Sequence, residues 1–110
     1  MCGFMYTVIE TPLFISAAKD IWREDERASF CVWLAKNPEA GDVIPGSGGC
    51  RKVRWMSQGF GKRGGVRVIY FNKLSAGVIY LLIIYAKYVQ DNIPAHILKA
   101  IKEELEDDNY

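Results

Sequence analysis

The run Val78–Ala86, VIYLLIIYA, is the part of the sequence that most constrains the fold. It contains no charged residue, yet it is far shorter than the ~20 apolar residues that a membrane-spanning helix needs. Its β-branched and aromatic side chains favour a strand, and a strand this apolar has to be covered on folding. The run therefore predicts a buried strand in a globular domain.

Two segments with the same character precede this run. Cys50–Ser57 and Val66–Asn72 are rich in Val, Ile, Tyr and Trp, and the apolar run itself extends over Gly77–Lys87. The intervening sequences QGFGKRGG and KLSA are short enough to close hairpins. We therefore expect three consecutive antiparallel strands.

The first third of the chain changes to a helical period after a short opening strand. Met5–Glu10 has strand composition, and a Thr-Pro pair follows it as N-cap and first helical residue. Apolar residues then recur at three- and four-residue spacing through Leu13–Ile21 and again through Glu24–Lys36. The sequence predicts two helices, which end at the turn-rich loop NPEAGDVIPGSGG.

A third helix is predicted after Ile93-Pro94, with an apolar face made of Ile97, Leu98, Ile101 and Leu105. A chain of 110 residues, half of them hydrophobic, can bury one core, so residues 1–110 are expected to form a single domain. The order β-α-α-β-β-β-α predicts an α+β fold, in which a twisted, mainly antiparallel sheet packs against helices. We expect the helices on one face of that sheet and the other face partly open.

Charge is strongly segregated along the chain. The net charge is only +1, but residues 43–90 hold eight Lys or Arg and no acid, whereas the remainder holds six basic and thirteen acidic residues. One or two cations would be an ordinary solvated sheet face, but eight without an acid repel one another in the free protein. This pattern favours an anionic polymer such as nucleic acid as the partner.

Several kinds of chemistry find no support in the sequence. Cys2, Cys31 and Cys50 show no CxxC spacing, and His96 is the single histidine, so neither a disulfide framework nor a zinc site is indicated. The N-terminus lacks the pattern of a signal peptide, and a reducing, cytoplasmic location without a membrane fits best. No Ser-His-Asp, Cys-His or paired-carboxylate arrangement can be drawn, and no cofactor is expected. An enzyme built from this sequence would have to use Lys, Arg and Tyr.

Strand alternation arranges part of the basic segment. Lys52 and Arg54 are predicted on one face of their strand and Arg51, with Val53 and Trp55, on the other. Arg67 can join either face, because the register between the strands is not known from the sequence. Such a group of cations suits phosphodiester chemistry on RNA, where attack by a ribose 2′-hydroxyl builds up charge on the phosphate.

Four further residues, Arg51, Lys62, Arg63 and Tyr88, are candidates for contact with RNA. Lys62 and Arg63 lie at a predicted hairpin tip, where they are either phosphate-binding arms or parts of an ordinary polar loop. GFGKRGG lacks the spacing of a Walker A loop. Tyr85 and Tyr88 lie on either side of Lys87, and they suit base stacking or proton relay, although Tyr85 is equally consistent with an aromatic residue at the edge of the core.

These segments resemble a known family. GCRKVRW, VRVIYF and the strand ending in YAKY, together with the loop NPEAGDVIPGSGG, resemble the RelE/HigB toxins of bacterial type II toxin–antitoxin systems. The resemblance runs from the first strand to the last helix. Its most specific part is the combination of NPEAGDVIPGSGGCRKVRW with GKRGGVRVIYF.

The resemblance implies a ribosome-dependent mRNA interferase, a metal-free endoribonuclease that cuts mRNA in the A site. It implies two partners, the ribosome with its mRNA and a cognate antitoxin, usually of the helix-turn-helix type, through which DNA is contacted indirectly. Carried over by position, Lys52, Arg54 and Arg67 match the family's strand cations, and Lys87 matches its basic residue after the last strand. Where RelE has a second cation after that lysine, this sequence has Tyr88, so Lys87 and Tyr85 are both assigned near the proton-transfer position.

Two alternatives come from other functional classes. ParE-like toxins share the strand order of this superfamily and poison DNA gyrase without cutting RNA. A non-catalytic RNA-binding module would use the same cations to bind phosphates and would leave the RNA intact.

Overall fold

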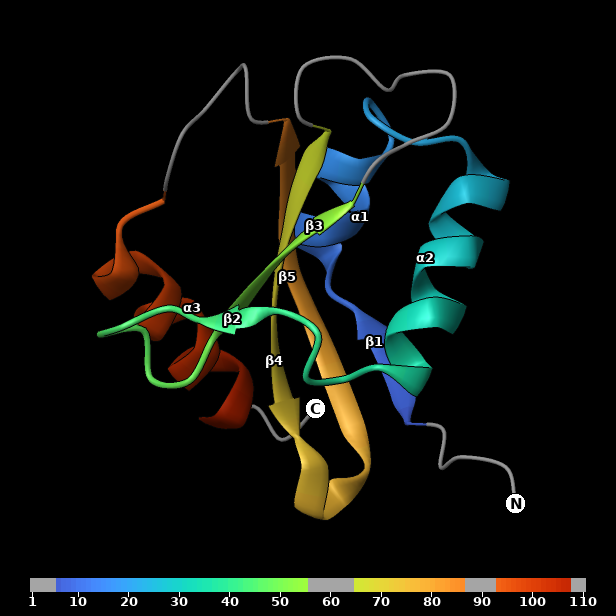
Figure 1. Ribbon diagram of the computed structural model, residues 1–110. Helices are drawn as coiled ribbons and strands as arrows, with labels where there is room; N and C mark the ends of the chain where they lie inside the picture. The colour runs from blue at the N-terminus through green and yellow to red at the C-terminus, as the bar shows by residue number, and fades with distance from the viewer. Residues whose placement is uncertain (1–5, 56–64, 87–92, 108–110) are drawn as a thin grey trace.

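The computed structural model describes residues 6–55, 65–86 and 93–107. A single sheet stands between two helical layers, with α1 and α2 on one side and α3 on the other (Figure 1). The elements, in chain order, are β1 (Thr7–Glu10), α1 (Pro12–Ala18), α2 (Glu24–Lys36), β2 (Asp42–Val43), β3 (Arg51–Trp55), β4 (Val66–Lys73), the 3-10 turn η1 (Leu74–Ala76), β5 (Val78–Ala86) and α3 (Ala95–Asp107).

The sheet has the strand order β1-β5-β4-β3-β2. The predicted antiparallel β3, β4 and β5 are confirmed, and β1 joins the sheet parallel to β5. The strand β2 was not predicted. Its two residues, inside the expected loop, pair with the beginning of β3.

The first helical layer is anchored at Thr11, the predicted N-cap of α1. The Thr11 hydroxyl accepts a hydrogen bond from the Phe14 amide (3.3 Å) and donates one to the Leu81 carbonyl of β5 (2.7 Å). The cap therefore fixes the start of the helix and also ties it to the sheet. Phe14, Phe30 and Leu34 are fully buried between this layer and the sheet.

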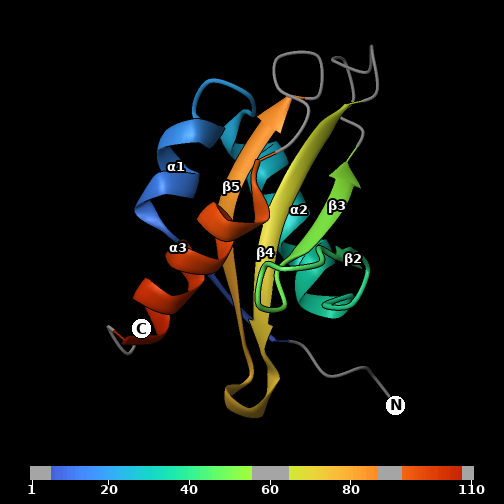
Figure 2. The ribbon, with the colours of Figure 1, turned by 90° about the vertical axis from the view of Figure 1, so that its left-hand side faces the viewer.

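The opposite face of the sheet is covered in part by α3, so the expectation that all helices share one face was wrong. Leu98 and Leu105 of α3 are buried against a second core, in which Phe71 and Tyr80 stack with their ring centroids 4.9 Å apart. Ile97, predicted on the apolar face of this helix, points away and is 43% exposed. Figure 2 looks onto the sheet from the side of α3.

A loop before β3 supports α3. The Ser47 side chain is buried, donates to the Ile44 carbonyl (2.6 Å) and accepts from the Cys50 amide (3.0 Å), which closes the turn internally. Cys50 is also buried, and its sulfur lies 3.9 Å from the Leu98 carbonyl of α3. The start of β3 and the first half of α3 are therefore in direct contact.

A half-buried polar group lies between β1 and α2. The Arg27 Nε lies 3.0 Å from the Glu10 carboxylate, and the Cys31 thiol donates to the same carboxylate at 3.7 Å. Burial, together with the negative charge of Glu10, raises the pKa of Cys31 to about 12.

Candidate nucleic-acid interface

A row of three predicted site residues crosses the sheet. Arg54 of β3 lies directly opposite Arg67 of β4, which in turn lies opposite Tyr85 of β5. Residues paired in this way project from the same face of an antiparallel sheet. The register therefore settles the position of Arg67, which alternation alone left open, and it places the two arginines side by side.

Lys52 joins this row from two residues further back on β3. Residues two apart on a strand share a face, so Lys52, Arg54 and Arg67 all project toward the side of the sheet that carries α3. Arg54 is exposed, whereas Lys52 and Arg67 are half-buried. We call Lys52, Arg54 and Arg67 the cationic row.

Tyr85 reaches this face because β5 contains an irregularity. Ile69 pairs with Ile83 but Tyr70 pairs with Leu81, so Leu82 is an extra residue in β5. Beyond the bulge the alternation is reversed, and both Leu82 and Tyr85 pack in the core on the α3 side. A strand without the bulge would point Tyr85 toward α1 and α2.

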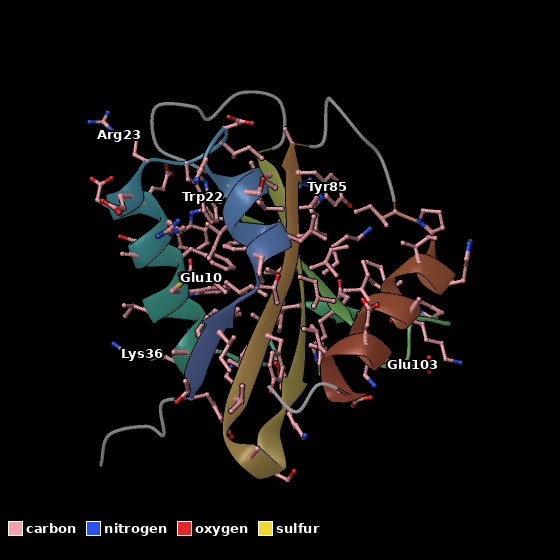
Figure 3. The ribbon with its side chains drawn as sticks, turned by 180° about the vertical axis from the view of Figure 1, so that it is seen from behind. Glu10, Trp22, Arg23, Lys36, Tyr85 and Glu103 are labelled. Atoms are coloured by element: carbon pink, nitrogen blue, oxygen red, sulfur yellow. The ribbon has the colours of Figure 1, made fainter. Side chains whose placement is uncertain are left out.

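Tyr85 is only 6% exposed. Its side chain extends from β5 toward the α3 side, whereas Trp22 lies on the opposite side among α1 and α2 (Figure 3). The ring therefore belongs to the edge of the core. It lies directly opposite Arg67 on the neighbouring strand and does not offer an open stacking surface.

Arg51 occupies the opposite face, as alternation predicts. Its guanidinium donates to the Gly41 carbonyl at 2.7 Å and to the Glu39 carbonyl at 3.5 Å. Nearby, the buried Tyr70 hydroxyl donates to the Pro38 carbonyl and accepts from the Gly41 amide, each at 2.9 Å. The structure thus separates Arg51 from the cationic row and gives its side chain a part in holding the loop before β2.

The sequence reasoning missed Asp42. In the chain it lies just before the segment without acids, but the short strand β2 places it directly opposite Lys52. Asp42 is exposed and projects to the same face as the cationic row. The face that carries the cationic row therefore also carries an acid, although the sequence segment of the row does not. The pairing of β2 with β3 is what places Asp42 there.

The remaining predicted site residues, Lys62, Arg63, Lys87 and Tyr88, lie outside the described residues. In the described ranges, no group of three or more His, Cys, Asp or Glu side chains is arranged to hold a metal ion. No helix within those ranges has the length and apolar character to span a membrane.

The geometry suits the binding of a phosphodiester. Two guanidinium groups and an ammonium group on one sheet face can stabilise the charge that develops on a phosphate under attack. Guanidinium groups also donate pairs of hydrogen bonds that match phosphate oxygens.

Comparison with known proteins agrees with this architecture. No family model matches the sequence. Among solved structures, the E. coli toxin RelE, as a double arginine-to-alanine mutant in the free state, is similar, with a TM-score of 0.58 over 96% of this chain and 99% of that chain at 13% sequence identity.

The chain has the RelE fold. The fold places β3, β4 and β5 side by side, and this chain's own register then assembles the cationic row on them.

Proposed function

We propose that this chain is the toxin of a type II toxin–antitoxin pair and acts as a ribosome-dependent mRNA interferase. The observation that carries the proposal is the cationic row, with Arg54 and Arg67 directly opposite each other on a sheet of the RelE fold. Two guanidinium groups on one face at directly opposed positions can both donate hydrogen bonds to the oxygens of one phosphate, which supports an anionic ligand.

In the proposed reaction, a ribose 2′-hydroxyl attacks the adjacent phosphate and the 5′-oxygen of the next nucleotide leaves. Lys52, Arg54 and Arg67 stabilise the charge on the pentacoordinate phosphate. Lys87 and Tyr85 are assigned near the proton-transfer position, with Tyr85 holding Arg67 in place. Arg51, Lys62, Arg63 and Tyr88 are proposed to contact substrate or ribosomal RNA, and no metal takes part.

The proposed partners follow from this activity. The ribosome supplies the mRNA in its A site, and a cognate antitoxin, of the helix-turn-helix type, neutralises the toxin and provides its indirect link to DNA. The proposed setting is the cytoplasm.

Substitution of Arg67 tests the proposal. Arg67→Ala is expected to lower mRNA cleavage by about 100-fold or more, because it removes one charge from the phosphate site. The chain is induced briefly in a bacterial host, and new 5′ ends on transcripts are mapped by primer extension with and without a block of translation. Arg23→Ala is the matched control, since Arg23 is an exposed arginine at the start of α2 in the other helical layer (Figure 3).

Three results would contradict the proposal. Cleavage that survives Arg67→Ala would show that the cationic row is not the site. Growth arrest with intact transcripts and broken DNA would indicate a gyrase inhibitor, and RNA binding without cleavage would indicate a binding module. Arg67→Gln, which keeps more of the side chain's packing, and a thermal melt of each variant distinguish lost chemistry from lost folding.

A further inference from the structure

Two lysines of α3 lie beside the loop that leads into β3. A methyl group placed on Gly48 would be 3.4 Å from Lys99 Cγ and 3.5 Å from Lys102 Cδ, so both side-chain stems run past this glycine. The backbone of Gly48 has a φ of +79°, a conformation that favours glycine and keeps the space beside the stems free. The stems of the two lysines of α3 therefore lie against this loop.

The same contact brings these lysines close to the cationic row. Leu98, the neighbour of Lys99, contacts Cys50 through its carbonyl. Cys50 faces α3, and Lys52 and Arg54 follow at alternate positions on the same face, each step being about 7 Å. Cations from β3 and α3 thus lie on the same side of the sheet, to either side of the Cys50–Leu98 contact. We call this region the β3–α3 seam and define it by Arg54, Lys52, Lys99 and Lys102.

The two lysines of α3 differ in their surroundings. Lys102 is 17% exposed, pairs with Glu106 at 3.1 Å and lies 5.4 Å from the centre of the Phe71 ring. Its ammonium group is therefore engaged in contacts within the protein. Lys99 is exposed. It is the lysine of α3 whose ammonium group is accessible to a ligand in the seam.

Acidic residues set the limits of this seam. Asp42 projects beside Lys52 from the edge strand β2. On α3 itself, Glu103, Glu104 and Glu106 lie in the last turns, beyond the two lysines. A polyanion following the seam would be attracted as far as Lys99 and repelled further along the helix.

We infer that the RNA backbone continues from the cationic row along the β3–α3 seam, where Lys99 binds a phosphate other than the one that reacts. This inference rests on the proposed function for the identity of the polyanion. A contact of this kind adds salt-dependent affinity without base specificity. It assigns to α3 a part in holding the substrate in addition to its part in the core.

Binding of a short, fluorescein-labelled, single-stranded 2′-O-methyl RNA, followed by fluorescence anisotropy, tests the inference directly, because this RNA cannot be cleaved through its 2′ position. Lys99→Ala is expected to weaken binding by roughly three- to tenfold at low salt and to reduce the slope of log K against log salt by about 0.7, the value for one lost phosphate contact on a single strand. Lys99→Arg, which keeps the charge, should retain the affinity.

Two further variants sharpen the test. Asp42→Asn should strengthen binding by about two- to threefold, since it removes a negative charge that repels the RNA from the seam. Lys36→Ala should leave binding unchanged, because Lys36 is an exposed lysine at the end of α2, on the far side of the sheet (Figure 3).

The inference is overturned if the RNA affinity of Lys99→Ala equals that of the wild type and of Lys36→Ala. It is also overturned if the wild type shows no affinity for this RNA at low salt. These outcomes are distinct from failure of the proposed function. Lost cleavage in Arg67→Ala with normal binding in Lys99→Ala would keep the mRNA interferase and reject the seam. A binding defect in Lys99→Ala, with transcripts that stay intact when the wild-type chain is induced in the cell, would support the seam and reject the mRNA interferase.

Discussion

Among the residues that the structure describes, Cys31 is the one whose pKa the fold raises most. Burial beside the Glu10 carboxylate raises its pKa to about 12 from the ordinary thiol value of 9.0. Burial also raises the pKa of Cys50. Since the thiolate is the reactive form, both thiols are protected in the folded chain near neutral pH.

We therefore predict that iodoacetamide at pH 8 leaves Cys31 and Cys50 unmodified in the folded protein and alkylates both in urea. Peptide mapping by mass spectrometry gives the modified fraction at each position. Rapid alkylation of Cys31 under native conditions would contradict the raised pKa and partial burial of its thiol.

The same pKa shift has a consequence for stability. A pKa that is higher in the folded state favours the protonated thiol, so the stabilisation is complete below pH 9 and is lost as the pH rises toward 12. The free energy of unfolding of wild type should accordingly fall more steeply above pH 9 than that of Cys31→Ala.

Single residues also show where sequence reasoning stops. The shared face of Lys52 and Arg54, and the opposite face of Arg51, follow from alternation within one strand, which is a local property. The positions of Arg67 and Asp42 depend on register between strands and on a short edge strand, which are tertiary properties. The first pair could be predicted from the sequence, and the second could not.

Among the elements, β2 is held in an unusually close approach to β3. A methyl group added at Gly41, the residue before β2, would lie 2.8 Å from the Lys52 carbonyl oxygen and 3.0 Å from the Tyr70 hydroxyl. Backbone atoms cannot move aside as a flexible side chain does. Glycine at this position therefore allows the edge strand to form.

Gly41→Ala is predicted to lower the free energy of unfolding by about 1–3 kcal/mol, the usual cost of overfilling a packed site. Urea denaturation measures the change. The neighbouring exposed position provides the control, since Ala40→Ser should stay within about 0.5 kcal/mol of wild type. Equal stabilities for the two variants would show that β2 can shift without cost.

Helices and long strands were predictable because their periodicity extends over many residues. The bounds of α2 were predicted as Glu24–Lys36, as the structure has them, and Thr11 is the N-cap that the sequence indicated. Two residues of β2 carry no periodic signal. The apolar stripe of α3 predicted a packed helix, but such a stripe does not specify which face of the sheet it covers.

At the scale of the whole molecule, the two faces of the sheet differ in what they carry. The face under α1 and α2 holds the larger aromatic cluster, in which Phe30 and Trp55 meet edge to face at 5.1 Å. The other face divides between the core under α3 and the cationic row. A net charge of +1 conceals this division, because the acids lie mainly on the helices.

Because binding to the folded chain alone stabilises it, single-stranded RNA should raise the melting temperature. At a free RNA concentration 100 times Kd the gain is about 2.7 kcal/mol, or roughly 10 °C for a domain of this size. Differential scanning fluorimetry with uncleavable RNA measures the shift, which high salt should abolish. A shift that persists in high salt would indicate apolar contacts in place of phosphate contacts.

The extra residue in β5 divides that strand into two halves with opposite alternation. Residues before Leu82 obey one alternation and residues after it obey the other. Deletion of Leu82 would leave Tyr85 opposite Arg67 in a regular strand, whereas the full-length β5 paired without a bulge would turn Tyr85 to the opposite side of the sheet. A relative that has lost one residue here can therefore keep both the fold and the tyrosine beside the arginine, so a gap in an alignment at this position does not by itself indicate a changed site.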